Sequence, residues 1–442
     1  MKAMSSAPQT VRDEHWTRTD SWLFWSFGLG MLLENYIFSL SSVATQWVPM
    51  PKSLQSLLLA WSPIWLIIGI AVAGPLADRV GRKNTFYTTM ALYGLGAIGL
   101  VFSNQYALIL LFLAMLLFAA GGEMNTIMAV SHEMMPHKHR GKTMMLELNF
   151  INLGGVILGL VALSTAYQHV AFQRAMIALT LLVVLVILFF ARRNTPESIR
   201  WLERTGQHDR ARAEIEKFYG FEEYQARQEA ARRSTQAAQA SDASRAKRVG
   251  LKLFTTLTIS FAGSAGFGLM TYVLGPHFFP KMNAAIILVA TGTGFVSGFF
   301  GLWADRWSRK SLLLIGYLGS FVMTLVIWAT IPAWSKSLAL FWLLLVVLNV
   351  FVNIGYLTED TLKGEVWPTQ LRGTYTALVR FISIGLYIAT IYITQNFGIT
   401  AYTMFNALVW AIGLAGAVAW WIGGYETGKG TSLDVASGEL DT

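Results

Sequence analysis

The sequence predicts an all-α integral membrane protein in which twelve transmembrane helices form two pseudo-symmetric halves of six. Of its 442 residues, 54% are hydrophobic and only 13% are charged, whereas about a quarter of the residues of a soluble protein are charged. The apolar residues occur in long runs, and a spanning helix needs about 20 of them. Two loop motifs, each present twice, divide the chain into two similar parts.

Twelve apolar segments are the expected helices, because a lipid-exposed backbone must satisfy its hydrogen bonds within its own segment. In the first half they are residues 21–46, 54–77, 84–102, 106–133, 142–167 and 172–192. In the second half they are residues 252–276, 282–303, 311–330, 338–362, 373–396 and 400–424. These runs are too long for the strands of an outer-membrane barrel. Cysteine is absent, which excludes disulfides and thiolate sites.

The loops between these segments alternate in charge. One set holds most of the basic residues: Arg79, Arg82, Lys83, Lys138, Arg140, Lys142, Arg306, Arg309, Lys310, Lys363 and Arg372. The other set holds only Lys52, Arg174, Lys281 and Lys336. Lysine and arginine are retained on the cytoplasmic side of a membrane. We therefore expect a multi-pass protein of the cell's inner (plasma) membrane with both termini in the cytoplasm.

The polar segment in the middle of the chain joins the two halves. The predicted organisation is a cytoplasmic tail at 1–20, a six-helix half at 21–192, a cytoplasmic loop with surface helices at 193–250, a second half at 251–424 and a tail at 425–442. The basic residues of the central loop suit anionic lipid headgroups. No recognition motif accompanies the net charge of +9, so nucleic acid is not an expected partner.

The internal repeat consists of two pairs of loops. GPLADRVGRK (Gly74 to Lys83) matches GLWADRWSRK (Gly301 to Lys310) at an offset of 227 residues. EMMPHKHRG, beginning at Glu133, matches EVWPTQLRG, beginning at Glu365, at an offset of 232 residues. Both offsets are close to half the chain, which indicates duplicated halves. Repeats of this kind form a binding site at their interface, near the middle of the membrane.

Four ionisable residues lie inside the apolar runs: Glu34, Glu123, Glu147 and Arg380. At about 1.5 Å per residue, Glu34 lies about 20 Å from the cytoplasmic end of its helix, and we expect all four to open onto one central cavity. Such residues mark substrate pathways and proton relays. Removal from water favours the protonated form of a carboxylic acid. Glu34, Glu123 and Glu147 are therefore the predicted proton-coupling residues.

Polar stripes at helical spacing indicate cavity-lining faces in the second half. For a single Ser, Thr or Asn, interhelical packing explains such a position equally well. The predicted substrate-binding residues are Arg380, Tyr36, Asn349, Asn353, Tyr356, Ser383 and Tyr387.

Arg380 has two interpretations that the sequence leaves open. Its guanidinium can bind a substrate carboxylate through paired hydrogen bonds, or it can pair with Glu147, at similar depth, as a gate between the halves. The three acids inside the apolar runs (Glu34, Glu123 and Glu147) outnumber the one base, Arg380. This balance would also suit a cationic or zwitterionic substrate.

These motifs together resemble those of the major facilitator superfamily. GPLADRVGRK resembles its best-known loop motif, which recurs weakly in the second half, as here. TPESIRWLERTG resembles a motif of the sugar porter and organic-ion transporter branches, while LLENYIF and GGEMN resemble motifs of metabolite:proton symporters. The resemblance covers nearly the whole chain. It implies a secondary active transporter that works by alternating access, usually as a monomer.

The resemblance also implies a cytoplasmic latch in which the loop aspartate pairs with the arginine one turn later and faces a helix N-terminus. The gate residues implied here are Asp78, Arg79, Arg82, Glu133, Arg140, Asp305, Arg309, Glu365 and Arg372. The chain departs from the family pattern in three places. Ile37 replaces an acid of helix 1, Leu113 and Ala114 stand where helix 4 often has an arginine, and Ser308 replaces the glycine of the second loop motif.

The predicted function is a transporter, not an enzyme. It moves a small polar organic metabolite, with an organic anion or zwitterion favoured, by proton symport. The alternatives are a proton-coupled drug or metabolite exporter, an organic-cation transporter and, from another class, a transport-inactive sensor or membrane enzyme, which no motif supports. The expected partners are the small-molecule substrate, protons and the lipid bilayer.

Two further signals carry little weight in this prediction. His132, His137 and His139 lie in the latch loop without a convincing ligand set, so we expect no metal site and no cofactor. The run GSAGFG (Gly263 to Gly268) lies in an apolar helix, where glycines favour close packing.

Overall fold

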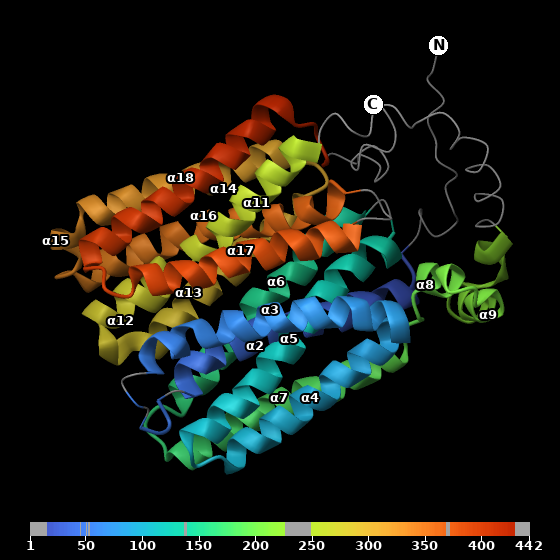
Figure 1. Ribbon diagram of the computed structural model, residues 1–442, viewed down its shortest axis with the longest axis horizontal. Coiled ribbons are helices and arrows are strands. Elements are labelled where there is room, and N and C mark those ends of the chain that lie inside the picture. Colours follow the sequence, from blue (N-terminus) through green and yellow to red (C-terminus); the bar gives the residue numbers. More distant parts are fainter. Residues whose placement is uncertain are drawn as a thin grey trace.

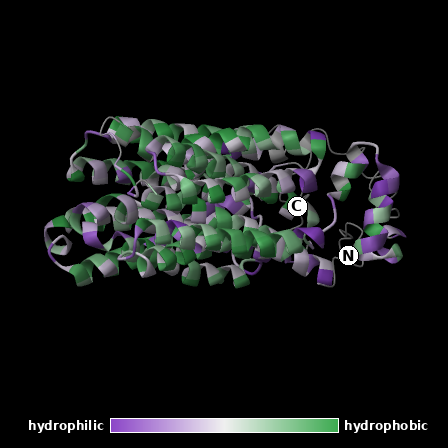
Figure 2. Cartoon of the chain, turned by 90° about the horizontal axis from the view of Figure 1, so that it is seen from below, coloured by the Kyte–Doolittle hydropathy of each residue, from purple (hydrophilic) through white to green (hydrophobic). Residues whose placement is uncertain are grey.

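The computed structural model describes residues 16–44, 46–49, 51, 54–136, 139–225, 249–367 and 372–428. In this part of the chain, 12 helical segments are long and apolar enough to cross a membrane. The predicted all-α fold with twelve spans is therefore confirmed. The segments lie side by side in one elongated bundle (Figure 1). Hydrophobic residues dominate the bundle, and hydrophilic residues gather at one of its ends (Figure 2).

Six long helices form the first half of the bundle. They are α2 (Arg18–Ala44), α3 (Gln55–Val80), α4 (Arg82–Phe102), α5 (Tyr106–Met134), α6 (Arg140–Ser164) and α7 (Val170–Arg193). Two short helices follow, α8 (Ile199–Arg204) and α9 (His208–Tyr219), beyond the right-hand end of the bundle in Figure 1. We call this end the loop end, because α3 meets α4 and α14 begins there.

The second half contains the other six spans. They are formed by α11 (Val249–Gly266) with η4 (Leu269–Leu274) and α12 (Gly275–Phe278); η5 (Pro280–Met282) with α13 (Asn283–Gly298) and η6 (Phe299–Trp303); α14 (Arg309–Ala329); α16 (Leu338–Glu365); α17 (Arg372–Thr394); and α18 (Ile399–Gly423). The short helix α15 (Ile331–Trp334) joins α14 to α16. The start of α2 and the end of α18 both lie at the loop end (Figure 1).

The seventh span is not the continuous helix predicted for residues 252–276. α11 ends at Gly266, and Gly268 adopts a φ of 78°, a left-handed conformation that favours glycine. The chain then continues as the π-helical η4. The glycines do serve close packing, as expected, since a Cβ at Gly266 would lie 2.6 Å from Trp410. One glycine thus ends the helix and another lets α18 approach it.

Close approach of backbones also holds α3 against α5. A Cβ at Gly69 would overlap the carbonyl oxygen of Phe118, and a Cβ at Gly121 would overlap the carbonyl oxygen of Leu66. Small residues allow membrane helices to pack backbone to backbone. This pairing fixes two helices that line the first half's side of the central cavity.

The two halves meet mainly along two helix pairs, α6 with α13 and α3 with α17, and α6 also contacts α16. The contact of α6 is rich in asparagine. Asn152 Nδ2 donates to Asn353 Oδ1 at 2.8 Å, and Asn353 Nδ2 donates to the carbonyl oxygen of Gly294 at 2.8 Å. Asn149 Nδ2 donates to the carbonyl oxygen of Phe295 at 3.0 Å. The bonds from Asn152 and Asn149 join the halves beside the cavity, whereas the bond from Asn353 to Gly294 holds α16 to α13 within the second half.

Candidate functional site

A cavity of about 210 Å³ lies between the two halves. Helices α2, α3, α5 and α6 line it on one side, and α11, η4, α13, α14, α16, α17 and α18 line it on the other. Its ionisable acids and bases are Glu34, Glu359, Asp360, Lys363 and Arg380. The position at the interface of the repeats matches the expectation from the sequence.

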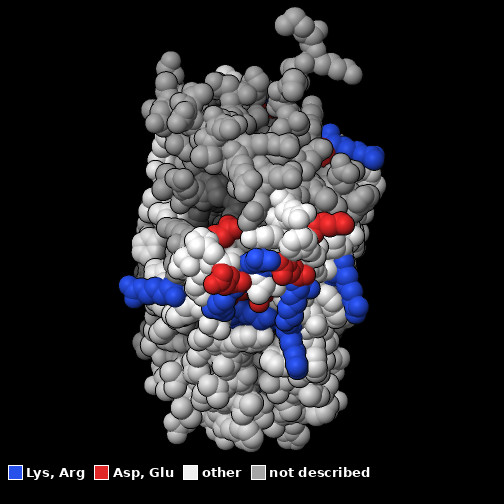
Figure 3. Space-filling view, turned by 90° about the vertical axis from the view of Figure 1, so that its right-hand side faces the viewer, with Lys and Arg blue, Asp and Glu red and all other residues white. Residues whose placement is uncertain are grey.

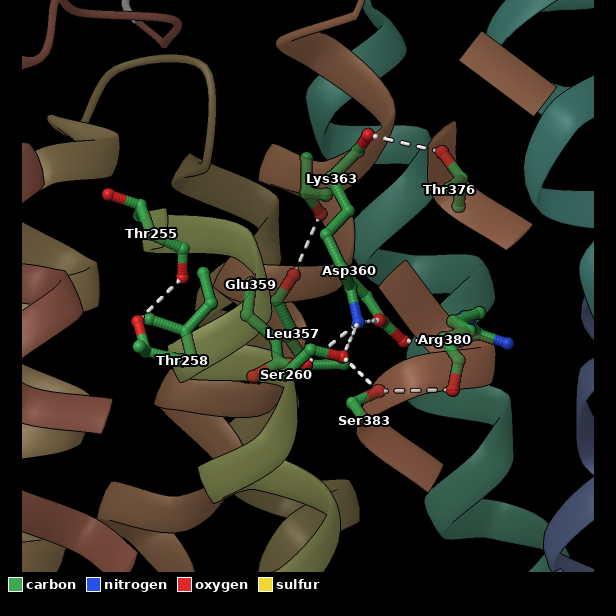
Figure 4. Close-up of polar contacts among 12 residues, drawn as sticks. Thr255, Thr258, Ser260, Leu357, Glu359, Asp360, Lys363, Thr376, Arg380 and Ser383 are labelled. Atoms are coloured by element: carbon green, nitrogen blue, oxygen red, sulfur yellow. Dashed lines mark hydrogen bonds and ion pairs between the residues drawn. The ribbon is translucent and has the colours of Figure 1, made fainter. Parts of the chain in front are cut away.

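Four of these charged groups form one cluster in the second half (Figure 4). Lys363 follows Glu359 by four residues and Asp360 by three on α16, so both carboxylates reach its ammonium group. Lys363 Nζ lies 2.8 Å from Glu359 Oε1 and 2.5 Å from Asp360 Oδ1. Arg380 Nη2, on α17, lies 3.1 Å from Asp360 Oδ2. All four side chains are at most 7% exposed, so the ion pairs offset the large cost of burying each charge.

Neutral donors and acceptors complete the cluster. Lys363 Nζ donates to Ser260 Oγ at 3.1 Å, and Ser260 Oγ lies 3.0 Å from Ser383 Oγ. The hydroxyl of Tyr317 donates to Glu359 Oε2. The cluster thus holds two carboxylates, two cations and several hydroxyl groups within the wall of the cavity.

Glu34 is the cavity-lining ionisable residue of the first half. It lies on α2, is half-buried, and its Oε2 atom has no hydrogen-bond partner among the described residues. The other four charged groups of the cavity are all held in ion pairs. Glu34 is therefore the carboxyl group with spare hydrogen-bonding capacity at this site.

The expectation that four intramembrane residues open onto one cavity was wrong for two of them. Glu34 and Arg380 line the cavity, whereas Glu123 and Glu147 do not. Glu123 pairs with the buried Arg192 of α7. Glu147 Oε2 accepts a hydrogen bond from Ser131 Oγ at 2.5 Å. Their rotation about the helix axes directs both carboxyl groups into the first half.

This arrangement also bears on the two interpretations of Arg380. Its partner in the structure is Asp360 on the neighbouring helix, and Glu147 lies outside the cavity. Arg380 Nη1 contacts Met124 Sδ of the first half at 2.9 Å, and its Nε has no hydrogen-bond partner among the described residues. The Nη1 and Nε atoms of the guanidinium therefore lack a strong acceptor among the described residues.

Most predicted substrate-binding residues lie on the cavity wall. They are Arg380, Asn349, Asn353, Tyr356, Ser383 and Tyr387. Tyr36 does not, because its hydroxyl donates to the carbonyl oxygen of Ile177 at 2.8 Å inside the first half. Asn353 is occupied in joining the halves, and Asn349 Nδ2 donates to its own helix at Leu345.

The sequence analysis did not place Glu359, Asp360, Lys363 and Arg192 inside the bundle, although all four are buried. Glu359 and Asp360 belong to the last turns of α16, which extends to Glu365, and Lys363 had been counted with the cytoplasmic loops. The signal that identifies them is the i, i+3 and i, i+4 spacing of opposite charges at the end of an apolar run. Arg192 ends an apolar run in the same way.

The loop end carries both acidic and basic side chains (Figure 3). Asp305 connects the halves there, since its Oδ2 accepts from the backbone nitrogen of Lys142, in the first turn of α6, at 3.1 Å. Its Oδ1 lies 3.7 Å from Arg309 Nη2, which also lies 3.3 Å from Glu365 Oε1. A carboxylate at a helix N-terminus is favourable. This contact holds the halves together at the loop end.

The first copy of the latch is formed by the loop motifs of the first half. Arg79 is exposed, Arg82 is half-buried and Arg140 is buried at the start of α6. The side chains of Asp78, Glu133 and Arg372 lie outside the described residues, as do the side chain of His132 and all of His137. In the part of the chain that the structure describes, no group of three or more His, Cys, Asp and Glu residues is placed to hold a metal ion.

The two loop motifs make matching contacts in the two halves. The backbone nitrogens of Arg82 and Lys83 donate to Glu197, and that of Arg309 donates to Glu426 at 2.8 Å. Lys83 Nζ and Lys310 Nζ each donate to a carbonyl oxygen at 2.9 Å, just after the last helix of their half. Glu426 is the second-half counterpart of Glu197, and the sequence analysis did not find it.

The replacement of a glycine by Ser308 has a clear structural result. Gly81 has a φ of 95°, whereas Ser308 has a φ of −69° and caps α14 through its hydroxyl, which accepts from Ser311 N at 3.2 Å. The second turn therefore has a different backbone conformation, and serine suits it as an N-cap.

Comparison with known proteins identifies the family. The family model of the Major Facilitator Superfamily matches residues 21–385. The chain belongs to this superfamily. It is therefore a multi-pass membrane transporter for small molecules rather than an enzyme.

Three members of the Major Facilitator Superfamily are distantly similar to it. The glucose transporter GlcP of Staphylococcus epidermidis is 24% identical over 372 residues, which cover 78% of this chain and 79% of GlcP. The niacin transporter NiaP of Acinetobacter baylyi is 27% identical over 197 residues, 43% of each chain. The structure of the proton:xylose symporter XylE bound to 6-bromo-6-deoxy-D-glucose superposes with a TM-score of 0.75 at 18% identity, covering 96% of this chain and 99% of XylE. This structural likeness shows the shared fold.

Proposed function

We propose that this superfamily member is a proton symporter for a small polar organic metabolite that carries a carboxylate, either an organic anion or a zwitterion. It works by alternating access, with the cavity open to one side of the membrane at a time. The observation that carries the proposal is the Oε2 atom of Glu34, which has no hydrogen-bond partner among the described residues, in a cavity whose other acids and bases are held in ion pairs. The likeness in fold to XylE, a proton:xylose symporter, agrees with proton coupling.

Glu34 suits proton carriage because its environment changes when the halves move. In a closed cavity the neutral acid avoids the cost of an unpaired buried charge. When the cavity opens, water stabilises the carboxylate and the proton leaves. Since Ile37 replaces the second acid of the family motif, Glu34 is the acid in the apolar part of α2 that can carry the proton, whereas Asp20 accepts hydrogen bonds from Thr17 at the start of the helix.

Arg380 suits a substrate carboxylate. Its Nε lacks a hydrogen-bond partner among the described residues, and its Nη1 contacts only the weak acceptor Met124 Sδ. Since these two atoms lie on different edges of the guanidinium, a carboxylate at either one forms a charge-assisted hydrogen bond. Glu34, across the cavity on the first half, is then available for a donor group of the same molecule. The similarity to NiaP, a niacin transporter, agrees with a carboxylated substrate.

A cationic substrate is the second candidate, and the charge balance of the cavity favours it. Three acids, Glu34, Glu359 and Asp360, face two bases, Lys363 and Arg380. With Glu34 ionised, the cavity carries one net negative charge. An organic cation would neutralise it, whereas a zwitterion would use both Glu34 and Arg380.

The orientation in the membrane follows from the charges at the ends of the bundle. We propose that the loop end faces the cytoplasm, because it carries the basic loop motifs. Both termini are then cytoplasmic in the plasma membrane. A monomer suffices for transport, since one chain supplies both walls of the cavity.

The decisive experiment is uptake into proteoliposomes under an imposed pH gradient, with Glu34→Gln as the test variant. The solutes are glucose, xylose and niacin, followed by any hit from a thermal-shift screen. We expect Glu34→Gln to lose uphill accumulation while counterflow exchange continues. Glu203→Gln, the same change on the exposed face of α8, is the control. Unchanged uphill accumulation in Glu34→Gln would contradict the proposal.

Arg380→Ala tests the substrate class. Loss of affinity for carboxylated solutes but not for neutral ones supports the carboxylate-binding role. Equal loss for both, or a preference for cations in the wild-type protein, argues for the second candidate.

A further inference from the structure

Tyr93 is a buried polar residue that the proposed mechanism has not used. It lies on α4, has 0% relative exposure, and its hydroxyl has no hydrogen-bond partner among the described residues. Leaving a buried donor unsatisfied costs about 1–3 kcal/mol. Phenylalanine would fill the same apolar surroundings without that cost. A tyrosine at this position therefore indicates a role for its hydroxyl group.

The side of α4 that carries Tyr93 also contacts a buried ion pair of the first half. One turn before it on α4, Thr89 Oγ1 donates to Glu123 Oε2 at 2.8 Å. Glu123 is ion-paired with Arg192 of α7. Arg192 lies over the ring of Phe86, seven residues before Tyr93 and therefore on the same face of α4. The face of α4 that carries Tyr93 is thus the face that contacts the ion pair of Glu123 and Arg192.

Glu34 occupies the same layer of the bundle as Tyr93. One turn before Glu34 on α2 is Gly30, where a Cβ would lie 2.5 Å from Glu123 Oε1 and 3.2 Å from Arg192 Nη2. Both α2 and α4 run away from the loop end, so Glu34 and Tyr93 each lie four residues, or about 6 Å, beyond a residue that lies against Glu123. Glu34 faces the cavity, and the pair of Glu123 and Arg192 lies one layer closer to the loop end.

We propose that Tyr93 is a proton relay between Glu34 in the cavity and the ion pair of Glu123 and Arg192 inside the first half. The proposal rests on the proposed function, in which Glu34 carries the transported proton. It makes Glu123 a second proton-holding site that the substrate does not touch. It also assigns Arg192 the part of the cation that Leu113 and Ala114 cannot supply from α5.

The transfer conserves protons and charge. The protonated carboxyl of Glu34 gives its proton to the oxygen of Tyr93, and the hydroxyl proton of Tyr93 passes to the carboxylate of Glu123. A phenol can do both because it donates one hydrogen bond and accepts another. At the end Glu34 is a carboxylate, Tyr93 is neutral again and Glu123 is a neutral acid. Negative charge has moved from Glu123 to Glu34, towards the cations of the second half.

The test uses the proton itself as the probe, so that no substrate needs to be known. Proteoliposomes on a solid-supported membrane receive a step in pH, and the resulting charge displacement is recorded. We expect a wild-type signal that Glu34→Gln abolishes and that Tyr93→Phe slows at least tenfold. Glu123→Gln should remove the same component. Thermal stability of Tyr93→Phe should equal or exceed that of the wild type, because the lost hydroxyl has no hydrogen-bond partner among the described residues.

Tyr87→Phe is the matched control. It makes the same change on the same helix, but at a half-buried ring that packs against Phe189. Wild-type kinetics in Tyr93→Phe would overturn the relay while leaving proton coupling through Glu34 intact. A wild-type signal that Glu34→Gln does not alter would instead overturn the proposed function. A destabilised Tyr93→Phe protein would show that the hydroxyl is structural, and would also overturn the relay.

Discussion

Replacing Lys363 by methionine should destabilise the protein strongly, because Lys363 is the shared cation of the buried cluster. Its ammonium group lies 2.8 Å from Glu359 and 2.5 Å from Asp360. In Lys363→Met, Asp360 keeps Arg380 at 3.1 Å, so only Glu359 loses its cation. Removing one partner of a buried ion pair costs about 3–5 kcal/mol. We expect a loss in the free energy of unfolding of this size and not twice it.

The assay is the folded fraction that remains after heating in detergent, read by fluorescence-detected size exclusion. A carboxylate without its cation takes up a proton as the pH falls, so the defect of Lys363→Met should be smaller at acidic than at neutral pH. The double variant Glu359→Gln/Lys363→Met should recover much of the loss, because both charges are removed together. Lys217→Met, on the exposed face of α9, should have little effect.

Two outcomes would refute this reasoning. A Lys363→Met protein as stable as the wild type at neutral pH would mean that the cluster is hydrated, since water would then stabilise Glu359 in place of the lysine. A double variant less stable than Lys363→Met would mean that packing of the Lys363 side chain, rather than its charge, holds α16 in place.

Two more predictions concern the latch and the helix break. Asp305→Asn removes the charge that faces the N-terminus of α6 and pairs with Arg309, an effect of about 0.3–1 kcal/mol. Spin-label distances across the loop end should therefore show the open population rising severalfold at most, and an unchanged distribution would contradict a latch there. Gly268→Ala should lower thermal stability by about 1–2 kcal/mol, because φ is 78° and the new Cβ would lie 2.5 Å from Tyr272. Gly250→Ala, where a Cβ meets nothing within 4 Å, should not lower thermal stability. Equal stability of the two variants would contradict the proposed backbone strain at Gly268.

The candidate site was only partly predictable from the sequence. Glu34 and Arg380 were identified because an ionisable residue inside an apolar run is expensive and seldom faces lipid. Asp360 and Lys363 were not, because charged residues near the end of a run look the same whether they lie in a loop or inside the bundle. Tyr36 was assigned to the cavity on residue type alone, whereas its hydroxyl is bonded within the first half.

The sequence by itself determined the number of spans, the division into halves and the place of the cavity between them. Hydrophobic length and a repeated loop are properties of the chain that need no tertiary contact to be recognised. Only the tertiary structure decided which charges meet. Glu123 pairs with Arg192, 69 residues away, and Arg380 pairs with Asp360 rather than Glu147. The physical reason is that partner choice depends on the rotation and tilt of each helix. Packing against neighbouring helices sets both, and apolar periodicity leaves them undetermined when a helix is hydrophobic all round.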